Sequence, residues 1–209
     1  MRWLLIWVLA ACPAWGGNGT AGEFDYYVLS LSWSANWCAR EGDARRSDQC
    51  DARHNHGWIL HGLWPQYTRG WPSYCQTAKR PPSHRMTQDM ADIMGSSGLA
   101  WHQWKKHGTC SGLSADDYFA QSRQAYDSLT RPEVFRRLQR SVKLPASVVE
   151  QAFLASNPGW VPDMLTITCK DGYIHEARFC LSRDLIPMPC GPDVLRDCQS
   201  NDALFAPIR

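Results

Sequence analysis

The residues best suited to chemistry lie in the segment WHQWKKHGTC, residues 101–110, which combines two histidines, two lysines and a glutamine amide. If this segment is helical, His102 shares a face with Lys106, because residues four apart lie one turn apart. Gln103 and His107 share a face for the same reason. Such a surface offers cationic donors to an oxyanion and an imidazole that can carry a proton near neutral pH. The density of these groups favours a catalytic site over a solvated basic helix end.

A second histidine of interest lies in GWILHGLWPQY, residues 57–67. The apolar start of this segment predicts a short buried strand, which Gly62 and Pro65 would end. His61 then lies where a rigid strand meets a cleft, beside two tryptophans and a glycine that permits close approach of a ligand. We therefore interpret His61 as a catalytic residue, in preference to a core histidine with a polar partner.

Length and composition predict one folded domain. The chain has 209 residues, of which 44% are hydrophobic and 20% charged, and this is enough to bury a core. Its net charge of +2 is too small to identify a nucleic-acid-binding protein by electrostatics alone. Eleven tryptophans suit either a packed core or a surface on which flat groups stack.

The first residues resemble an export signal. Residues 1–17 contain a positive start, a short apolar run and small residues, which is typical of a cleaved signal peptide. The segment LAAC also resembles a bacterial lipobox, which would make Cys12 a lipidated first residue, but cleavage and release is the favoured interpretation. The chain would then continue with a flexible segment at 18–22 and one catalytic domain at 23–209. We expect a secreted or periplasmic protein.

Cysteine usage agrees with export. An even set of cysteines behind a signal peptide predicts four disulfides in an oxidising compartment, and sequence alone does not decide their pairing. A zinc site is less favoured, since no CxxC pair occurs. With Cys12 set aside, the eight are Cys38, Cys50, Cys75, Cys110, Cys169, Cys180, Cys190 and Cys198.

Alternation and turn residues predict three strands besides the one that carries His61. Residues 24–33 alternate apolar side chains with serines, which predicts a half-buried strand. Residues 165–169 and 173–181 predict two more, joined by a tight turn at Asp171-Gly172.

Helical spacing and capping residues predict the remaining elements, and together they indicate a single α+β domain. Methionines recur at helical spacing over 86–94, Ser114 is expected to cap a helix, Pro132 and Pro145 are expected to open two more, and Gly108 should turn the chain out of the helix after His107. Loops are expected at 38–57, with His54 and His56 exposed, at 68–85, and in the stretch that ends the chain.

Two histidines on separate elements, with an adjacent lysine, suit acid–base chemistry on a phosphodiester. RNA carries its own nucleophile, the 2′-hydroxyl. An enzyme needs only to remove that proton, protonate the departing 5′-oxygen and stabilise charge on the phosphoryl oxygens. One imidazole must be neutral and the other protonated, which is feasible because free histidine titrates at about 6.5. No metal or cofactor is needed, and DNA, which lacks the 2′-hydroxyl, would be bound but not cut.

The segments WILHGLWPQY and WHQWKKHGTC resemble the two active-site segments of the ribonuclease T2 family of secreted endoribonucleases. The segments FDYYVLSLSW, SGLSADDYF, ITC and RFCL are similar to that family as well, so the resemblance covers essentially the whole mature chain. It implies an α+β domain with a central antiparallel sheet flanked by helices. It also implies an RNA substrate and cleavage through a 2′,3′-cyclic phosphate, and we expect a monomer.

The resemblance implies a role for each matching residue. His61 resembles the general acid for the leaving oxygen, and His107 the general base on the 2′-hydroxyl. Lys106 resembles the lysine that stabilises the pentacovalent phosphorane, and His102 the histidine that helps to hold the phosphate. The implied base-binding residues are Trp64, Gln66 and Tyr67, and the implied disulfides are Cys75–Cys110, Cys180–Cys190 and Cys169–Cys198, which leaves Cys38–Cys50 as the fourth.

Two positions depart from the family pattern. Gln103 stands where the family usually has a catalytic glutamate, and a glutamine can donate a hydrogen bond but cannot titrate. We therefore expect an active enzyme with an altered pH profile. Gln66 stands where some members have an acidic base-reading residue, so no base preference is predicted.

Three other readings compete with a ribonuclease. A family member that has lost catalysis and acts as an RNA-binding or signalling protein has Gln103 as its only support. A zinc hydrolase would use His54, His56, His102 or His107, but the last two are five residues apart with no carboxylate between them. A serine hydrolase is weaker still, because no GxSxG segment is present.

Overall fold

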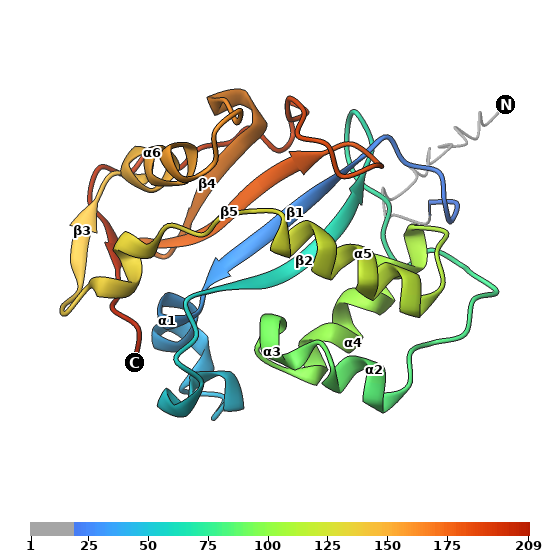
Figure 1. Cartoon of the computed structure of the whole chain (residues 1–209), viewed down its shortest axis with the longest axis horizontal. Helices are drawn as coiled ribbons and strands as arrows, with labels where there is room; N and C mark the ends of the chain where they lie inside the picture. Colours follow the sequence, from blue (N-terminus) through green and yellow to red (C-terminus); the bar gives the residue numbers. More distant parts are fainter. Residues whose placement is uncertain (1–18) are drawn as a thin grey trace, which may run out of the picture.

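A six-stranded sheet forms the centre of the protein, in the order β2-β1-β5-β6-β3, with β4 paired to β5 (Figure 1). Every strand pair is antiparallel except the single β5–β6 contact between Tyr173 and Leu204. The strands are β1 (Tyr26–Trp33), β2 (Trp58–Gln66), β3 (Val142–Leu144), β4 (Leu165–Lys170), β5 (Tyr173–Leu181) and β6 (Ala203–Phe205). The predicted α+β class with one domain is confirmed.

This computed structural model describes residues 19–209. The predicted signal peptide at residues 1–17, and with it the lipidation predicted for Cys12, lies outside the described residues.

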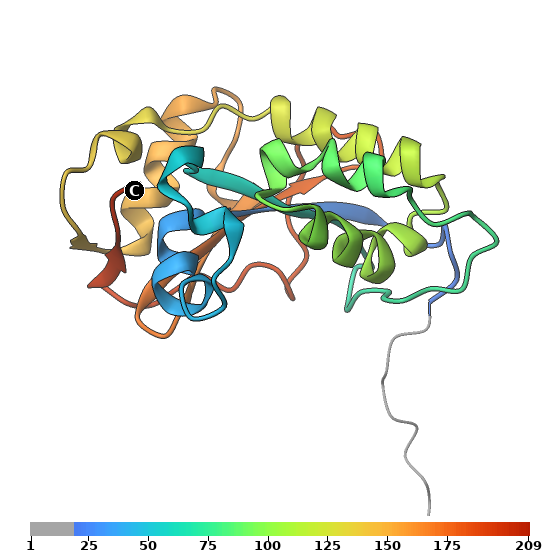
Figure 2. The same ribbon diagram turned by 90° about the horizontal axis from the view of Figure 1, so that it is seen from below.

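Helices cover the two ends of the sheet. In Figure 1, α2 to α5 gather beside β2, and α6 packs on β4 at the other end. Seen from below, α5 runs along one face of the sheet (Figure 2). None of the helices in residues 19–209 is long and apolar enough to cross a membrane. The helices are α1 (Ser34–Trp37), α2 (His84–Gln88), α3 (Ala91–Met94), α4 (Ser97–Lys106), α5 (Ala115–Asp127) and α6 (Ala146–Ser156).

Several sequence signals act as predicted. Ser114 caps α5 by accepting a hydrogen bond from the Asp117 amide. The hairpin between β4 and β5 turns at Asp171 and Gly172, whose φ angles of 52° and 80° are those of a two-residue hairpin turn. The segment 38–57 is more ordered than predicted, because it contains a π-helical turn at Cys38–Gly42 and two short 3₁₀ turns.

Strand β1 differs from its prediction because it is buried on both faces. Leu29, Leu31 and Trp33 enter the main core, as the alternation predicts. The serine face is closed too: Ser30 is 0% exposed and Ser32 is 7% exposed. The strand is buried because it lies inside the sheet, between β2 and β5, and other side chains cover both of its faces. A half-buried pattern was expected because serine is polar, but serine is also small enough to lie beneath larger side chains.

The strand that carries His61 contains a β-bulge at that residue. Gly62 lies opposite Ser30 in β1, but Leu60 lies opposite the next residue, Leu31, so His61 is an extra residue without a partner. A bulge of this kind reverses the alternation of side chains beyond it.

The bulge decides which side chains of β2 reach the functional face. Leu60 and Leu63 are three residues apart and would point to opposite faces of a regular strand, yet both lie in the main core. For the same reason His61 and Trp64 both lie on the opposite face. Without the bulge, only one of the two rings would face the cavity described below.

Four disulfides fasten the loops to this framework: Cys38–Cys50, Cys75–Cys110, Cys169–Cys198 and Cys180–Cys190. The last three are the pairs that the family resemblance implies, and Cys38–Cys50 is the pair that it leaves. The segment expected to be flexible at 18–22 is held in its described part, because Thr20 pairs with Gln76 and the Gly22 amide donates to the Cys110 carbonyl at 2.9 Å.

Strands β3 and β6 were not predicted. Each has three residues, too few for a hydrophobic period to appear in the sequence. The end of the chain is therefore held by strand pairing as well as by disulfides. Buried Asn36 holds it, accepting from the Ala206 amide at 2.8 Å and donating to the Leu204 carbonyl at 3.1 Å.

Removing the Cys75–Cys110 disulfide should lower the free energy of unfolding by about 4 kcal/mol, because the bond closes a separation of 35 residues in the unfolded chain. Removing Cys180–Cys190, which closes a separation of 10, should cost about 1 kcal/mol less. Urea unfolding of the two double-alanine variants measures both values. The opposite order of stability would contradict this loop-closure account.

Candidate active site

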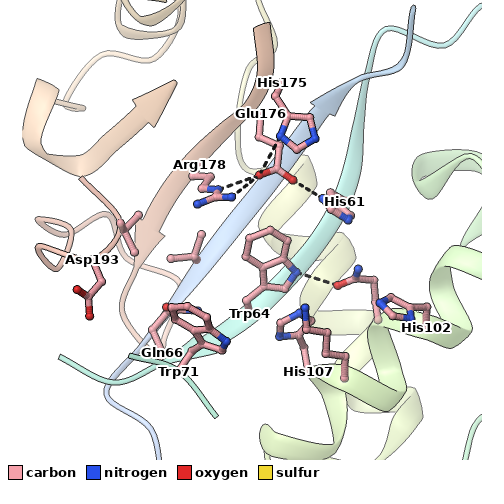
Figure 3. Close-up of a pocket in the computed structure, with 14 residues that line it drawn as sticks. His61, Trp64, Gln66, Trp71, His102, His107, His175, Glu176, Arg178 and Asp193 are labelled. Carbon is pink, nitrogen blue, oxygen red and sulfur yellow. Dashed lines mark hydrogen bonds and ion pairs between the residues drawn. The ribbon is translucent and has the colours of Figure 1, made fainter. Parts of the chain in front are cut away.

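A cavity of about 320 Å³ opens between α4 and the face of the sheet that lies opposite the main core (Figure 3). Strands β2 and β5 supply one wall and helix α4 supplies the other. The loop after β2 and the stretch that ends the chain close the remaining side. The residues that line it are Val28, His61, Trp64, Gln66, Trp71, His102, Gln103, Lys106, His107, His175, Glu176, Arg178, Asp193 and Val194.

Helix α4 presents its polar residues as predicted, with His107 at its end. Ser96 caps the helix by accepting from the Leu99 amide, and the His107 amide still donates to the Gln103 carbonyl at 2.9 Å. His102 is exposed, whereas Gln103 and His107 are buried.

The glycine that follows His107 has a different role from the one expected. Gly108 does not adopt a left-handed conformation. A side chain there would instead meet the rings behind the helix, since its Cβ would lie 2.5 Å from Trp104 and 2.9 Å from Tyr118. Gly108 is therefore required for close packing.

Trp64 connects the two histidines. The ring of His107 stacks on it at 5.2 Å between centroids and 22° between planes, and the ring of His61 meets it edge-on, also at 5.2 Å. The indole N–H donates to Gln103 Oε1 at 2.8 Å, which joins β2 to α4. A side chain at Gly62 would enter this contact, because its Cβ would lie 2.2 Å from Gln103 Oε1.

His61 also contacts a buried acidic group. Its Nδ1 hydrogen bonds to Glu176 Oε1, and the other carboxylate oxygen accepts two hydrogen bonds from Arg178, from Nε at 2.9 Å and from Nη2 at 2.6 Å. Burial alone would raise the pKa of Glu176, but the positive charges of His61 and Arg178 more than offset it and lower the pKa. The carboxylate is therefore ionised.

His107 lies in the opposite electrostatic setting. Burial lowers its pKa to about 2, and the positive charge of Lys106 and the rings of His61 and His102 act in the same direction. Its Nδ1 is buried with no hydrogen-bond partner among the described residues. The ring is therefore neutral at pH 7, and a negative ligand in the cavity would be the first charge to favour its protonation.

The cavity contains all the predicted site residues except Tyr67. His61, His102, Gln103, Lys106 and His107 come together, as do Trp64 and Gln66. Tyr67 packs against the main core instead. Successive residues at the end of β2 point in opposite directions, so Gln66 faces the cavity and Tyr67 faces away.

A different tryptophan supplies the free aromatic surface. Trp71 lines the cavity and is 54% exposed, whereas the ring of Trp64 is covered by His107 and has the Arg178 guanidinium 5.4 Å from its centroid. The loop that carries Trp71 is held in place by the Gly70 amide, which donates to Asp193 at 2.6 Å.

Sequence reasoning missed the contributions of β5 and of the last loop. Glu176 and Arg178 lie two apart in the strand, so both point to the cavity face. The segment HEARF carried a usable signal, a charged pair at strand spacing inside a predicted strand. Asp193 and Val194 lie in irregular chain, for which periodicity gives no information.

A second cavity of about 470 Å³ continues past His61, His102 and His175. Trp37, Lys170 and Arg45 line it farther from α4. The three histidines therefore lie between two hollows rather than at the bottom of one.

The described histidines form no metal site. Among residues 19–209, no group of three His, Cys, Asp or Glu side chains could hold a metal ion. His54 stacks on His56 at 5.2 Å and lies 3.4 Å from Asp48, away from the cavity.

The buried neutral His107 should make the protein less stable in mild acid. Because its pKa is lower in the folded than in the unfolded state, stability is complete above about pH 6.5 and falls as the pH decreases, by about 2 kcal/mol between pH 7 and pH 5. His107→Gln reduces this dependence and leaves only the part that comes from other histidines whose pKa burial lowers, whereas the exposed control His54→Gln keeps it in full. Urea unfolding at several pH values measures the slopes, and equal slopes for wild type and His107→Gln would contradict the account.

The sequence is similar to those of known bacterial ribonucleases. The sequence is 43% identical over 143 residues to a ribonuclease of Aeromonas hydrophila, a match that covers 67% of this chain and 62% of that protein. It is 28% identical over 211 residues to ribonuclease I of Escherichia coli K12, covering 80% of this chain and 79% of that one. The chain thus spans less than two thirds of the length of the Aeromonas protein.

The fold has solved relatives as well. An RNase-related protein from Calystegia sepium superposes with a TM-score of 0.64 at 18% identity, covering 89% of this chain and 98% of that chain. At the level of sequence, the profile of the Ribonuclease T2 family matches residues 24–190, a span that includes both histidine segments and most of the cavity. The resemblance noted in the two motifs therefore extends across the domain, and the chain belongs to the ribonuclease T2 family.

Proposed function

We propose that the protein is an endoribonuclease that cleaves single-stranded RNA by attack of the 2′-hydroxyl on the adjacent phosphorus, forming a 2′,3′-cyclic phosphate. The observation that carries this proposal is that His61 and His107, from separate elements, contact the same Trp64 ring and line one cavity together with Lys106. A phosphodiester between the rings would have an acid on one side and a base on the other.

His107 is the general base. It is neutral at pH 7 because burial lowers its pKa, so it has a lone pair for the 2′-hydroxyl proton. A ring with so low a pKa is a weak base in the empty cavity. The bound phosphate adds a negative charge beside it, which raises the pKa towards that of an effective base.

His61 is the general acid. Its side chain is 31% exposed, so its ring can reach a ligand in the cavity. As the bond from phosphorus to the 5′-oxygen breaks, His61 gives its proton to that oxygen. The base and the acid thus come from α4 and β2, on opposite sides of the cavity.

The phosphoryl oxygens are bound by the N–H donors of α4. Lys106 and His102 share one face of the helix and both line the cavity. Gln103 Oε1 already accepts from Trp64, so the amide NH₂ is the group left to donate to a phosphoryl oxygen. Glutamine can therefore replace part of the binding role of the family's glutamate, but not its charge or its proton.

The base of the nucleotide packs against Trp71, with Gln66 and Asp193 at its polar edge. An exposed aromatic face stacks on any base, and Trp71 is the most exposed ring in the cavity. The second hollow beyond the histidines lets the RNA chain continue, which suits internal cleavage.

Four disulfides favour export to a secreted or periplasmic location, and we propose that the exported protein is a monomer. DNA would be bound but not cut, because it lacks the 2′-hydroxyl that acts as the nucleophile. The competing proposal is a catalytically weakened member that binds RNA or signals, and it rests on Gln103 alone.

Cleavage of RNA should persist in EDTA and yield 2′,3′-cyclic phosphate ends, while His61→Ala and His107→Ala should each lower kcat by about 100- to 10,000-fold, since each removes a proton-transfer group. Product analysis by mass spectrometry identifies the ends. His54→Ala, outside the cavity, is the matched control and keeps full activity. Wild-type protein that binds RNA without cutting it would support the competing proposal.

Gln103→Glu should change the pH dependence of cleavage, because it adds a titratable group beside the phosphate while keeping an acceptor for the Trp64 N–H. The measurement is kcat/KM for a dinucleotide across the pH range, with Gln124→Glu on the exposed surface of α5 as the control. An unchanged rate and an unchanged pH optimum would contradict the expectation that charge at position 103 affects catalysis.

A further inference from the structure

We propose that Glu176 is the positioning residue for His61, which it holds with Nδ1–H on the carboxylate and Nε2–H directed at the leaving oxygen. This inference rests on the proposed function and deepens it, because it assigns a buried residue of β5 to the acid step.

The carboxylate is placed to act on one nitrogen of the ring. Glu176 is 1% exposed, and its two oxygens have separate partners, His61 Nδ1 on Oε1 and Arg178 on Oε2. A structural ion pair with Arg178 would need only one of these oxygens. The other is directed to a ring that lies in the cavity, as Figure 3 shows.

The contact spans a strand. His61 and Glu176 lie on β2 and β5, which are separated by β1 in the sheet. The residues of β1 beside this contact are Ser30 and Ser32, which pair with Arg178 and Glu176. Larger side chains there would block the path, so these two small residues of β1 leave room for the bond between the strands on either side of it.

Backbone irregularities bring both ends of the contact together. His61 is the extra residue of the bulge in β2, and a second bulge in β5 lies directly beside Glu176, where Thr168 pairs with Glu176 but Cys169 pairs with Ile174. Bulges re-aim side chains, and they are common beside active sites.

The chemistry of the acid step explains why the acceptor matters. When the 5′-oxygen departs, the bond from phosphorus to that oxygen breaks and the Nε2 proton of the imidazolium moves to it. His61 is left neutral with its remaining proton on Nδ1, hydrogen bonded to Glu176. Without the carboxylate, the ring can rotate or keep its proton on the other nitrogen, and the correct tautomer is no longer fixed.

Glu176 is the acidic member of a set around His61 in which Lys106 and Arg178 are positive and burial favours the neutral form of the other histidines. The titratable and charged groups that face the ring are Glu176, His175 and Arg178 from β5, and His102, Lys106 and His107 from α4 and its end. Replacing this carboxylate by a neutral amide therefore makes protonation of His61 less favourable. The alkaline side of the pH–rate profile should then move to lower pH.

The test compares two substrates in Glu176→Gln. A dinucleotide needs its leaving oxygen protonated, whereas a uridine 3′-nitrophenyl phosphate has a leaving group that departs as an anion. We expect kcat for the dinucleotide to fall about 10- to 100-fold, and that for the nitrophenyl ester to change less than about 2-fold, because only the first depends on acid catalysis. Asp171→Asn, the same type of change on the exposed turn of the same hairpin, is the control and should affect neither substrate.

The reference variants separate this inference from the proposed function. His61→Ala should show the same selective loss, and His107→Ala should lose both substrates. If Glu176→Gln slows both substrates equally while His61→Ala remains selective, Glu176 is only structural and the inference is wrong. If His61→Ala also slows both substrates equally, the acid role in the proposed function is wrong instead.

A measurement on the native protein covers the case in which Glu176→Gln does not fold. Nitrogen NMR of ¹⁵N-histidine-labelled protein, assigned against His61→Ala, identifies which ring nitrogen of neutral His61 carries the proton. Protonation at Nδ1, with a downfield N–H signal, is the expected result. A proton on Nε2 alone would overturn the inference.

Discussion

The hydrogen bond from the Trp64 indole to Gln103 is the contact on which the site depends, because it joins the strand that carries His61 to the helix that carries His107. It forms only where both backbones approach closely, and Gly62 allows this by having no side chain to fill the gap. The bulge one residue earlier turns Trp64 and His61 to the same face. The two histidines proposed to be catalytic are 46 positions apart in the sequence, and one glycine, one bulge and one indole bring them together.

The charges around the two rings differ, which suits the different roles proposed for them. His61 has an ionised carboxylate against its inner nitrogen, whereas His107 is buried beside Lys106 and an aromatic ring. Chemically identical side chains can act as acid and base only if their surroundings differ in this way. The cost of burying Glu176 is offset by the two positive partners that it contacts, and both of those line the cavity.

The sequence was informative wherever function depends on residue type and a long regular element. The two histidine segments, the capped helix α5, the β4–β5 hairpin and the α+β class could all be predicted. Tyr67 was expected in the site but lies outside the cavity, because a motif does not show which face a residue takes at the end of a strand. Glu176 was missed because its partner lies across a third strand, a relation that only the sheet order creates. Strands β3 and β6 are too short to leave a periodic signal.

The central claim is that His61 and His107 act on one phosphodiester from opposite sides. A crystal structure with a 2′-deoxy dinucleotide, which can bind but cannot react, tests it most directly. The account predicts the phosphorus between the two rings, with the 5′-oxygen within hydrogen-bonding reach of His61, the sugar C2′ facing His107 and Lys106 on a phosphoryl oxygen. A phosphate bound elsewhere, with either ring out of reach of it, would contradict the account.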